Sequence, residues 1–355
     1  MTKRVTRIAH ASVLHQQNQN YIYNTMAVTL QEINALRQKT QAGLMDCKKA
    51  LTEANGDMDA AMEILRKKGQ LVAAKRSDRE AAEGCVLAKV DGNFGAMIAL
   101  KCETDFVAKN ADFVALANKI IDAAVANKCK TLDEVKALDI DGTTAAEAVV
   151  DRSGVTGEKM ELDGYATVEG EQIVAYNHMG QNFLCTLVAF NKPCSEEVAK
   201  GVAMQVAAMS PIALDEASVP ESVKETELKN SVEKAKQNQV NKAVENALKK
   251  AGINPAHVDS EDHIESNTTK GWITPEQAAL AREIKATVAA EAEKALKPEM
   301  IQNIAKGMVA KFYKESCLLE QAYIDDNKVS VAQFLQSNDK ELTVTDFKRY
   351  TLRAE

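Results

Sequence analysis

Apolar residues recur at helical spacing over residues 26–70. Thr29 and Glu32 form an S/T-x-x-E capping box that starts the first helix. The pattern restarts at MDCKKAL (45–51), and Asp57 is placed to cap a third run. This segment predicts a three-helix module, which at about 40 residues is too small to be very stable alone.

The period changes to strict alternation over residues 84–102. GCVLAKV is a predicted strand, Asp91 with Gly92 is a hairpin signal, and FGAMIALKC is a second strand with alternate apolar residues on one face. A helix pattern follows, with an apolar stripe formed by Phe113, Leu116, Ala117, Ile120, Ile121 and Ala124. The predicted unit is therefore strand, strand, helix.

A similar pattern returns over residues 164–209. GYATVEG, QIVAYNHMG and FLCTLVAF are predicted strands, and SEEVAKGVAMQVAAM is a predicted helix. FGAMIALKCETDFVAKN parallels NFLCTLVAFNKPCSEEV in pattern more than in identity, which indicates an internal duplication. The second copy lacks the Thr-Asp-Phe-Val insert, so the duplicated scaffold does not itself require that insert.

Composition shifts to Lys, Glu, Gln, Asn and Ala over residues 221–297, where two apolar helical stripes predict an antiparallel helical hairpin, a coiled-coil arm. The predicted fold class is α+β, with a duplicated α+β core of antiparallel sheets and this inserted hairpin. The expected domains are an unstructured extension (1–25), the three-helix module (26–70), a first core subdomain with its linker (71–150), a second core subdomain (151–222), the hairpin (223–300) and the completion of the second core subdomain (301–355).

Composition and charge narrow the range of partners. The 355 residues are 45% apolar and 27% charged, and the net charge is -7. An acidic chain has no general electrostatic reason to bind nucleic acid or an anionic membrane, so direct contact with either is not expected and protein partners are favoured. Seven widely spaced cysteines without a CxxC pair indicate reduced thiols and a cytoplasmic location.

The sequence lacks a recognisable catalytic constellation. It contains neither G-x-x-x-x-G-K-[ST] nor G-x-G-x-x-G, and GVTGEK (154–159) has the wrong spacing for a phosphate-binding loop. His257 and His263 lie in an acidic segment that reads as a solvated hairpin tip more readily than as a metal site. Cys102 lies on an apolar strand face without a nearby histidine, which favours a core thiol over a nucleophile. No catalytic residue, cofactor or metal is therefore predicted.

KCETDFVAKN (101–110) raises two interpretations of Phe106. The strand pattern stops at Glu103, and Asn110 is placed to cap the next helix. Phe106 precedes Phe113 by seven residues, so an early helix start would place both in the core. Otherwise Phe106 is a surface residue with a contact role, and Met45 poses the same choice between core and contact.

Three strings resemble one family. AGLMDCKKALTEANGDMDAAMEILRKKG (42–69), KCETDFVAKN and AYNHMG (175–180) are similar to segments of bacterial and organellar elongation factor Ts, the guanine-nucleotide exchange factor of elongation factor Tu. The resemblance implies that the three-helix module is ubiquitin-associated-like. It also implies a non-enzymatic role in which the chain binds elongation factor Tu, both GDP-bound and nucleotide-free, and promotes GDP release so that GTP can rebind.

The same resemblance implies which residues contact the partner. Asp105 and Phe106, within the Thr104 to Val107 tetrad, match the family's exchange wedge, which enters the GTPase near its magnesium and phosphate elements. His178 matches a contact residue of the second half, and Leu44 with Met45 match the apolar contact of the N-terminal module. Together the implied site consists of Thr104, Asp105, Phe106, Val107, His178, Leu44 and Met45.

An adaptor is the competing interpretation. In it the N-terminal module binds a helical or ubiquitin-like partner, and the long hairpin serves as a docking arm. Self-association through the core or the hairpin also stays open. The Thr104 to Val107 tetrad favours the exchange factor, because an adaptor has no need of it.

Overall fold

The computed structural model describes residues 28–40 and 42–353, so the extension expected over residues 1–25 lies outside the described part. Contacts divide the chain into unit 1 (Met1–Ala208 with Leu342–Glu355) and unit 2 (Met209–Glu341). Every strand pair formed by the described residues is antiparallel, which confirms the α+β class. No helix in these ranges is long and apolar enough to cross a membrane.

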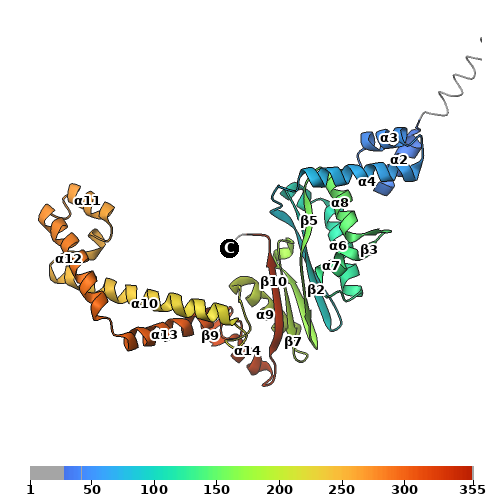
Figure 1. Ribbon diagram of the computed structural model, residues 1–355. Helices are drawn as coiled ribbons and strands as arrows, with labels where there is room; N and C mark the ends of the chain where they lie inside the picture. Colours follow the sequence, from blue (N-terminus) through green and yellow to red (C-terminus); the bar gives the residue numbers. More distant parts are fainter. Residues whose placement is uncertain (1–27, 41, 354–355) are drawn as a thin grey trace, which may run out of the picture. The chain divides into compact units, whose positions relative to one another are not determined.

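The elements of unit 1, shown in Figure 1, are α2 (Leu30–Thr40), α3 (Leu44–Glu53), α4 (Met58–Lys75), β1 (Glu83–Asp91), β2 (Phe94–Cys102), α5 (Asp105–Ala108), α6 (Ala111–Ala126), α7 (Leu132–Ala137), β3 (Asp139–Ile140), β4 (Thr143–Thr144), α8 (Ala145–Thr156), β5 (Met160–Glu169), β6 (Gln172–Asn177), η1 (His178–Gly180), β7 (Leu184–Phe190), α9 (Glu196–Met209) and β10 (Val344–Thr351). Those of unit 2 are α10 (Glu221–Lys250), η2 (Pro255–His257), α11 (Glu261–Thr269), α12 (Pro275–Ala295), α13 (Pro298–Ser316), β8 (Ala322–Tyr323), β9 (Asp326–Ser330) and α14 (Val331–Asn338).

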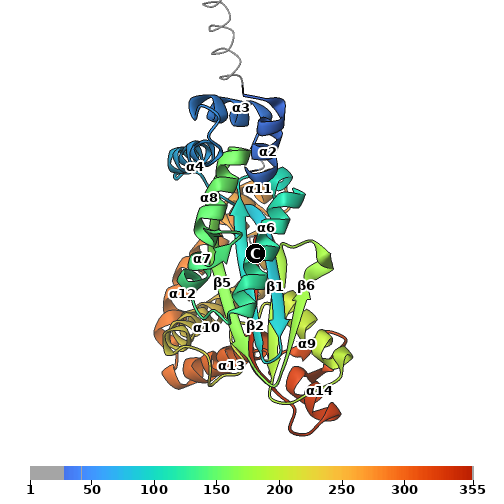
Figure 2. The same cartoon turned by 90° about the vertical axis from the view of Figure 1, so that its right-hand side faces the viewer.

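The first sheet has the strand order β1-β2-β5. The hairpin between β1 and β2 turns after Asp91, which pairs with Phe94, as the sequence predicts. Alternate side chains of β2 meet the predicted apolar stripe of α6 in one core, formed by Phe94, Ala96, Ile98, Leu100, Phe113, Ala117, Ile120, Ile121 and Ala124. Figure 2 looks onto this face, with α6 in front of β1 and β2. Apolar residues recur every second position in β2 and about every 3.6 positions in α6, so each element has one apolar face. These two apolar faces pack against each other.

The second sheet repeats this topology with the order β10-β7-β6. In each sheet a hairpin is followed by a helix and later by a third strand, which supports the predicted duplication. The expected boundary at residue 151 is wrong, because β5, which contains GYATVEG, pairs with β2 and completes the first sheet. Alternation identifies β5 as a strand but cannot say which strand it will pair with.

The two sheets pack face to face within unit 1. Met97 and Val168 of the first sheet share a buried cluster with Leu187 and Ala189 of the second. On the outer face of the second sheet, the Thr186 hydroxyl donates to the carbonyl oxygen of Ala203 in α9 at 3.1 Å. Unit 1 is therefore layered as helices, sheet, sheet and helix, and β2 and β7 are buried on both faces.

Helices α2, α3 and α4 enclose a small core of their own, formed by Ile33, Leu36, Ala42, Cys47, Ala50, Leu51 and Ala61. Asp57 caps α4 by accepting from two backbone N–H groups, as predicted. The expected end of the module at residue 70 is wrong, because α4 continues to Lys75. Gly69 does not end the helix. It lies instead where α4 crosses α8, against the backbone of Gly154.

Gly154→Ala is expected to lower the free energy of unfolding by about 1–3 kcal/mol through overpacking. A Cβ at this position would lie 2.4 Å from the Cα of Gly69, so the two helices would have to separate. Gly307→Ala in α13 is the matched control, because nothing lies within 4 Å of its Cβ position. The control should gain about 0.5–1 kcal/mol from helix propensity. Urea unfolding measures both, and a stabilised Gly154→Ala protein would contradict this helix crossing.

In unit 2, α10 packs against both α12 and α13. The expected division at residue 300 is wrong, since Ile301 and Ala305 are buried and the helix that contains them lies along α10. Residues 301–355 were expected to complete the second core subdomain. Within that range, β10 does so by pairing with β7 in the second sheet. A further core lies where α10, α11 and α12 meet, formed by Leu248, Ile253, Val258, Ile264, Ile273, Ala278 and Ala281.

Candidate protein-binding site

Between β2 and α6, residues 105–108 form a single helical turn, which the sequence pattern does not predict. Thr104 is its N-cap, and the threonine side chain accepts from the N–H of Val107. Helix α5 ends at Ala108, and Lys109 is its C-cap. Asn110 then caps α6 by accepting from two N–H groups, as predicted. Two capping residues six positions apart thus isolate a one-turn helix at the end of a buried strand.

The side chains of α5 point in two directions. Val107 and Ala108 pack against the core of the first sheet, whereas Phe106 is 84% exposed. Phe113, seven residues further along the chain, is fully buried. The interpretation that Phe106 extends the stripe of α6 is therefore wrong, because the separate cap at Asn110 breaks the helical register between the two phenylalanines.

Asp105 lies beside Phe106 at the start of the turn and forms an ion pair with Lys109, with Oδ2 2.7 Å from Nζ. This hydrogen bond lowers the pKa of the Asp105 carboxyl below its ordinary value. The carboxylate is therefore charged at neutral pH, next to an exposed aromatic ring.

The residues before α5 are held by a dense set of polar contacts. Glu158 accepts from the Thr104 hydroxyl at 2.7 Å and from its N–H at 3.1 Å. Glu103 accepts from the N–H of Lys159 at 2.6 Å and from the guanidinium of Arg76 at 2.8 Å. Burial opposes the charge on Glu103, yet these hydrogen bonds outweigh it and lower its pKa.

His178 begins the 3₁₀ turn that follows β6. Its Nδ1 lies 3.2 Å from the Tyr176 hydroxyl, and its ring meets that of Phe183 edge to face. The next residue, Met179, is 72% exposed and has a left-handed backbone with φ of 53°. A bulky residue in this conformation is uncommon and marks a constrained turn. Sequence reasoning missed Met179, whose one signal is its place between a histidine and a glycine.

Leu44 and Met45 occupy the first turn of α3, after Gly43. Both are exposed, Met45 by 60%, while Cys47, Ala50 and Leu51 provide the buried face of the helix. The interpretation of Met45 as a core residue is therefore wrong. The predicted contact residues thus occupy three elements, α5, η1 and α3, and each presents at least one exposed apolar side chain.

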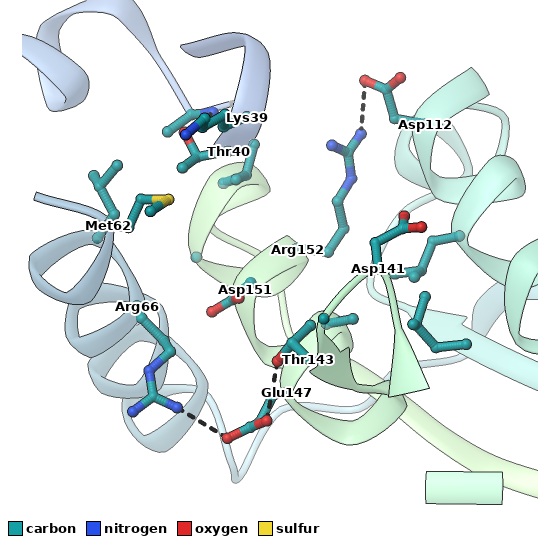
Figure 3. A pocket seen from close by; sticks show the side chains of 18 of the residues that line it. Lys39, Thr40, Met62, Arg66, Asp112, Asp141, Thr143, Glu147, Asp151 and Arg152 are labelled. Carbon is teal, nitrogen blue, oxygen red and sulfur yellow. Dashed lines mark hydrogen bonds and ion pairs between the residues drawn. The ribbon is translucent and has the colours of Figure 1, made fainter. Parts of the chain in front are cut away.

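A cleft of about 580 Å³ is lined by residues of α2, α4, α6 and α8 (Figure 3). Arg66 of α4 donates to Glu147 of α8 at 2.9 Å, and Arg152 of α8 donates to Asp112 of α6 at 3.2 Å. Burial raises the pKa of Asp151, which also lines the cleft. The first ion pair joins the N-terminal helix α4 to α8, and the second joins α8 to α6, so the cleft reads as a structural junction.

Cys102 and His263 are considered from the sequence as a nucleophile and as part of a metal site. Cys102 is buried, and desolvation raises the pKa of its thiol to about 12, so the reactive thiolate is scarce at neutral pH. His263 is hydrogen-bonded to Asp259 at the start of α11. Across residues 28–40 and 42–353, no group of three or more His, Cys, Asp or Glu residues is arranged to hold a metal ion.

Comparison with known proteins gives a consistent result. A family model described as Elongation factor TS matches residues 103–354. Elongation factor Ts of Phocaeicola vulgatus is 66% identical over 330 residues, which cover 93% of this chain and all of the relative. Those of Parabacteroides distasonis and Porphyromonas gingivalis are 65% and 42% identical with the same coverage of both chains. This chain belongs to the elongation factor Ts family.

Proposed function

We propose that the chain binds elongation factor Tu and promotes release of its GDP. The observation that carries this proposal is the exposed Phe106 on α5, an aromatic side chain turned away from its own core. Exposed aromatic residues are typical anchors of protein interfaces. Family membership supplies the identity of the partner.

Within the tetrad we assign different roles to the four residues. Phe106 is the wedge that enters the partner near its magnesium and phosphate elements, and Asp105 contacts the partner beside it. Thr104 and Val107 support the turn, because the first caps α5 and the second packs on the core. His178 and the pair Leu44 and Met45 provide the further contacts.

Exchange of this kind requires no catalytic group on the factor. The factor must bind the nucleotide-free partner more tightly than the GDP-bound partner, and GDP must in turn weaken the factor's binding by the same amount. To lower the partner's affinity for GDP ten-thousandfold, the factor must bind the nucleotide-free partner more tightly than the GDP-bound partner by about 5.5 kcal/mol. One anchor at the lower end of the usual range supplies about 2 kcal/mol, and the contacts at η1 and α3 are proposed to provide the rest.

The test is release of labelled GDP from purified elongation factor Tu, with and without the full chain. The proposal predicts faster release that rises with the concentration of the chain and saturates. Binding to the partner without any change in GDP release would support an adaptor instead and would overturn the proposal.

A further inference from the structure

Helix α5 lacks one half of a capping box. In a capping box, a Glu or Gln at the third helical position accepts from the N–H of the N-cap residue. The threonine or serine caps of α7, α8, α12 and α14 are completed in this way by Glu134, Glu147, Gln277 and Gln333. The third residue of α5 is Val107, which has no side-chain acceptor.

Glu158 occupies the place of the missing acceptor, 54 residues away along the chain. Its Oε2 accepts from the N–H of Thr104 at 3.1 Å, and its Oε1 accepts from the Thr104 hydroxyl at 2.7 Å. The threonine oxygen remains the acceptor for the N–H of Val107 at 3.4 Å. A glutamate from the turn after α8 thus completes the cap of a helix to which it does not belong.

Glu158 is itself held in place. Its carbonyl oxygen accepts from the Ser153 hydroxyl, and its N–H donates to the Thr156 side chain at 3.3 Å. Gly157 before it has the left-handed conformation that ends α8, with φ of 76°. The turn is therefore fixed to α8 before it reaches α5.

A one-turn helix depends on such outside support. Four residues form too few internal hydrogen bonds to stabilise a helix, so its geometry is set by tertiary contacts. Val107 and Ala108 anchor one side of α5 to the core, and Glu158 holds its start. Phe106 lies between these supports and makes no core contact of its own, so its direction follows from theirs.

We propose that Glu158 is a positioning residue for Phe106. By completing the cap of α5 from a distance, it fixes the turn in the orientation that presents the phenylalanine to the partner. This proposal rests on the proposed exchange function for its activity readout, but its structural part can be measured on the free chain.

The structural readout is hydrogen exchange of the amides in residues 103–110. Glu158→Ala should speed exchange at Thr104, whose N–H loses its acceptor, and at Val107 and Ala108, whose N–H groups donate to the hydroxyl and carbonyl oxygens of the loosened Thr104. Glu134→Ala is the matched control, since it removes the same kind of acceptor from the cap of α7 and should leave residues 103–110 unchanged. Unchanged exchange in Glu158→Ala would overturn the proposal whether or not the chain acts on elongation factor Tu.

The activity readout is GDP release at saturating concentrations of each variant. Glu158→Ala should slow release about five- to tenfold, as expected for a lost cap, while Glu134→Ala should match the wild type. Glu158→Gln keeps an acceptor for one of the two donors, so it should be partly active, and it replaces the alanine variant if that protein fails to fold. Normal release by both Glu158 variants, beside an active wild type, would overturn the positioning role and leave the exchange function intact.

A double-mutant cycle separates positioning from direct contact. If Glu158 acts through Phe106, adding Glu158→Ala to Phe106→Ala should change GDP release less than twofold, because the two losses are coupled. Multiplication of the two separate losses would show that Glu158 acts independently of the phenylalanine, and this result would contradict the proposal.

Discussion

Phe106→Ala is expected to slow GDP release from elongation factor Tu roughly thirtyfold or more, because loss of an interface anchor costs about 2 kcal/mol or more. The same change should alter the free energy of unfolding by no more than about 0.5 kcal/mol, since the side chain is 84% exposed. Stopped-flow release of labelled GDP and urea unfolding on one protein preparation measure both effects. A large loss of stability with near-normal release would return Phe106 to a structural role.

Phe113→Ala is expected to give the opposite result. The side chain is fully buried between α6 and the first sheet, so its truncation should cost about 3–5 kcal/mol of stability. Urea unfolding measures this loss directly. Under conditions in which the variant is folded, the rate of GDP release from elongation factor Tu that it promotes should stay within a few fold of the wild-type rate. A small change in stability would show that this core collapses around the missing ring.

The elements with a sustained period could be predicted from the sequence. The alternation of β2 and the stripe of α6 locate both faces of the first core, and Asn110 locates the start of the helix. The partner of β5 could not be predicted, because a strand pattern specifies a face and not a neighbour. Helix α5 was missed for a different reason, since one turn is too short to show a period.

Of the residues of the candidate site, some could be identified from the sequence and others could not. Residue pattern alone left Phe106 open between core and contact, and the family resemblance favoured contact; the structure then places the ring outside the core. Glu158 could not be found from sequence, because its partner Thr104 is 54 residues away and the string around it, GVTGEK, has no pattern that links it to the cap of α5. Contacts between distant turns depend on the finished fold, which local pattern does not encode.

The affinity of the chain for elongation factor Tu, measured by calorimetry with the partner first nucleotide-free and then GDP-bound, tests the exchange function most directly. The chain should bind the nucleotide-free partner more tightly than the GDP-bound partner, by the same factor with which it weakens the partner's affinity for GDP. Equal affinities for the two states would contradict it, because a ligand that does not distinguish two states cannot shift the balance between them.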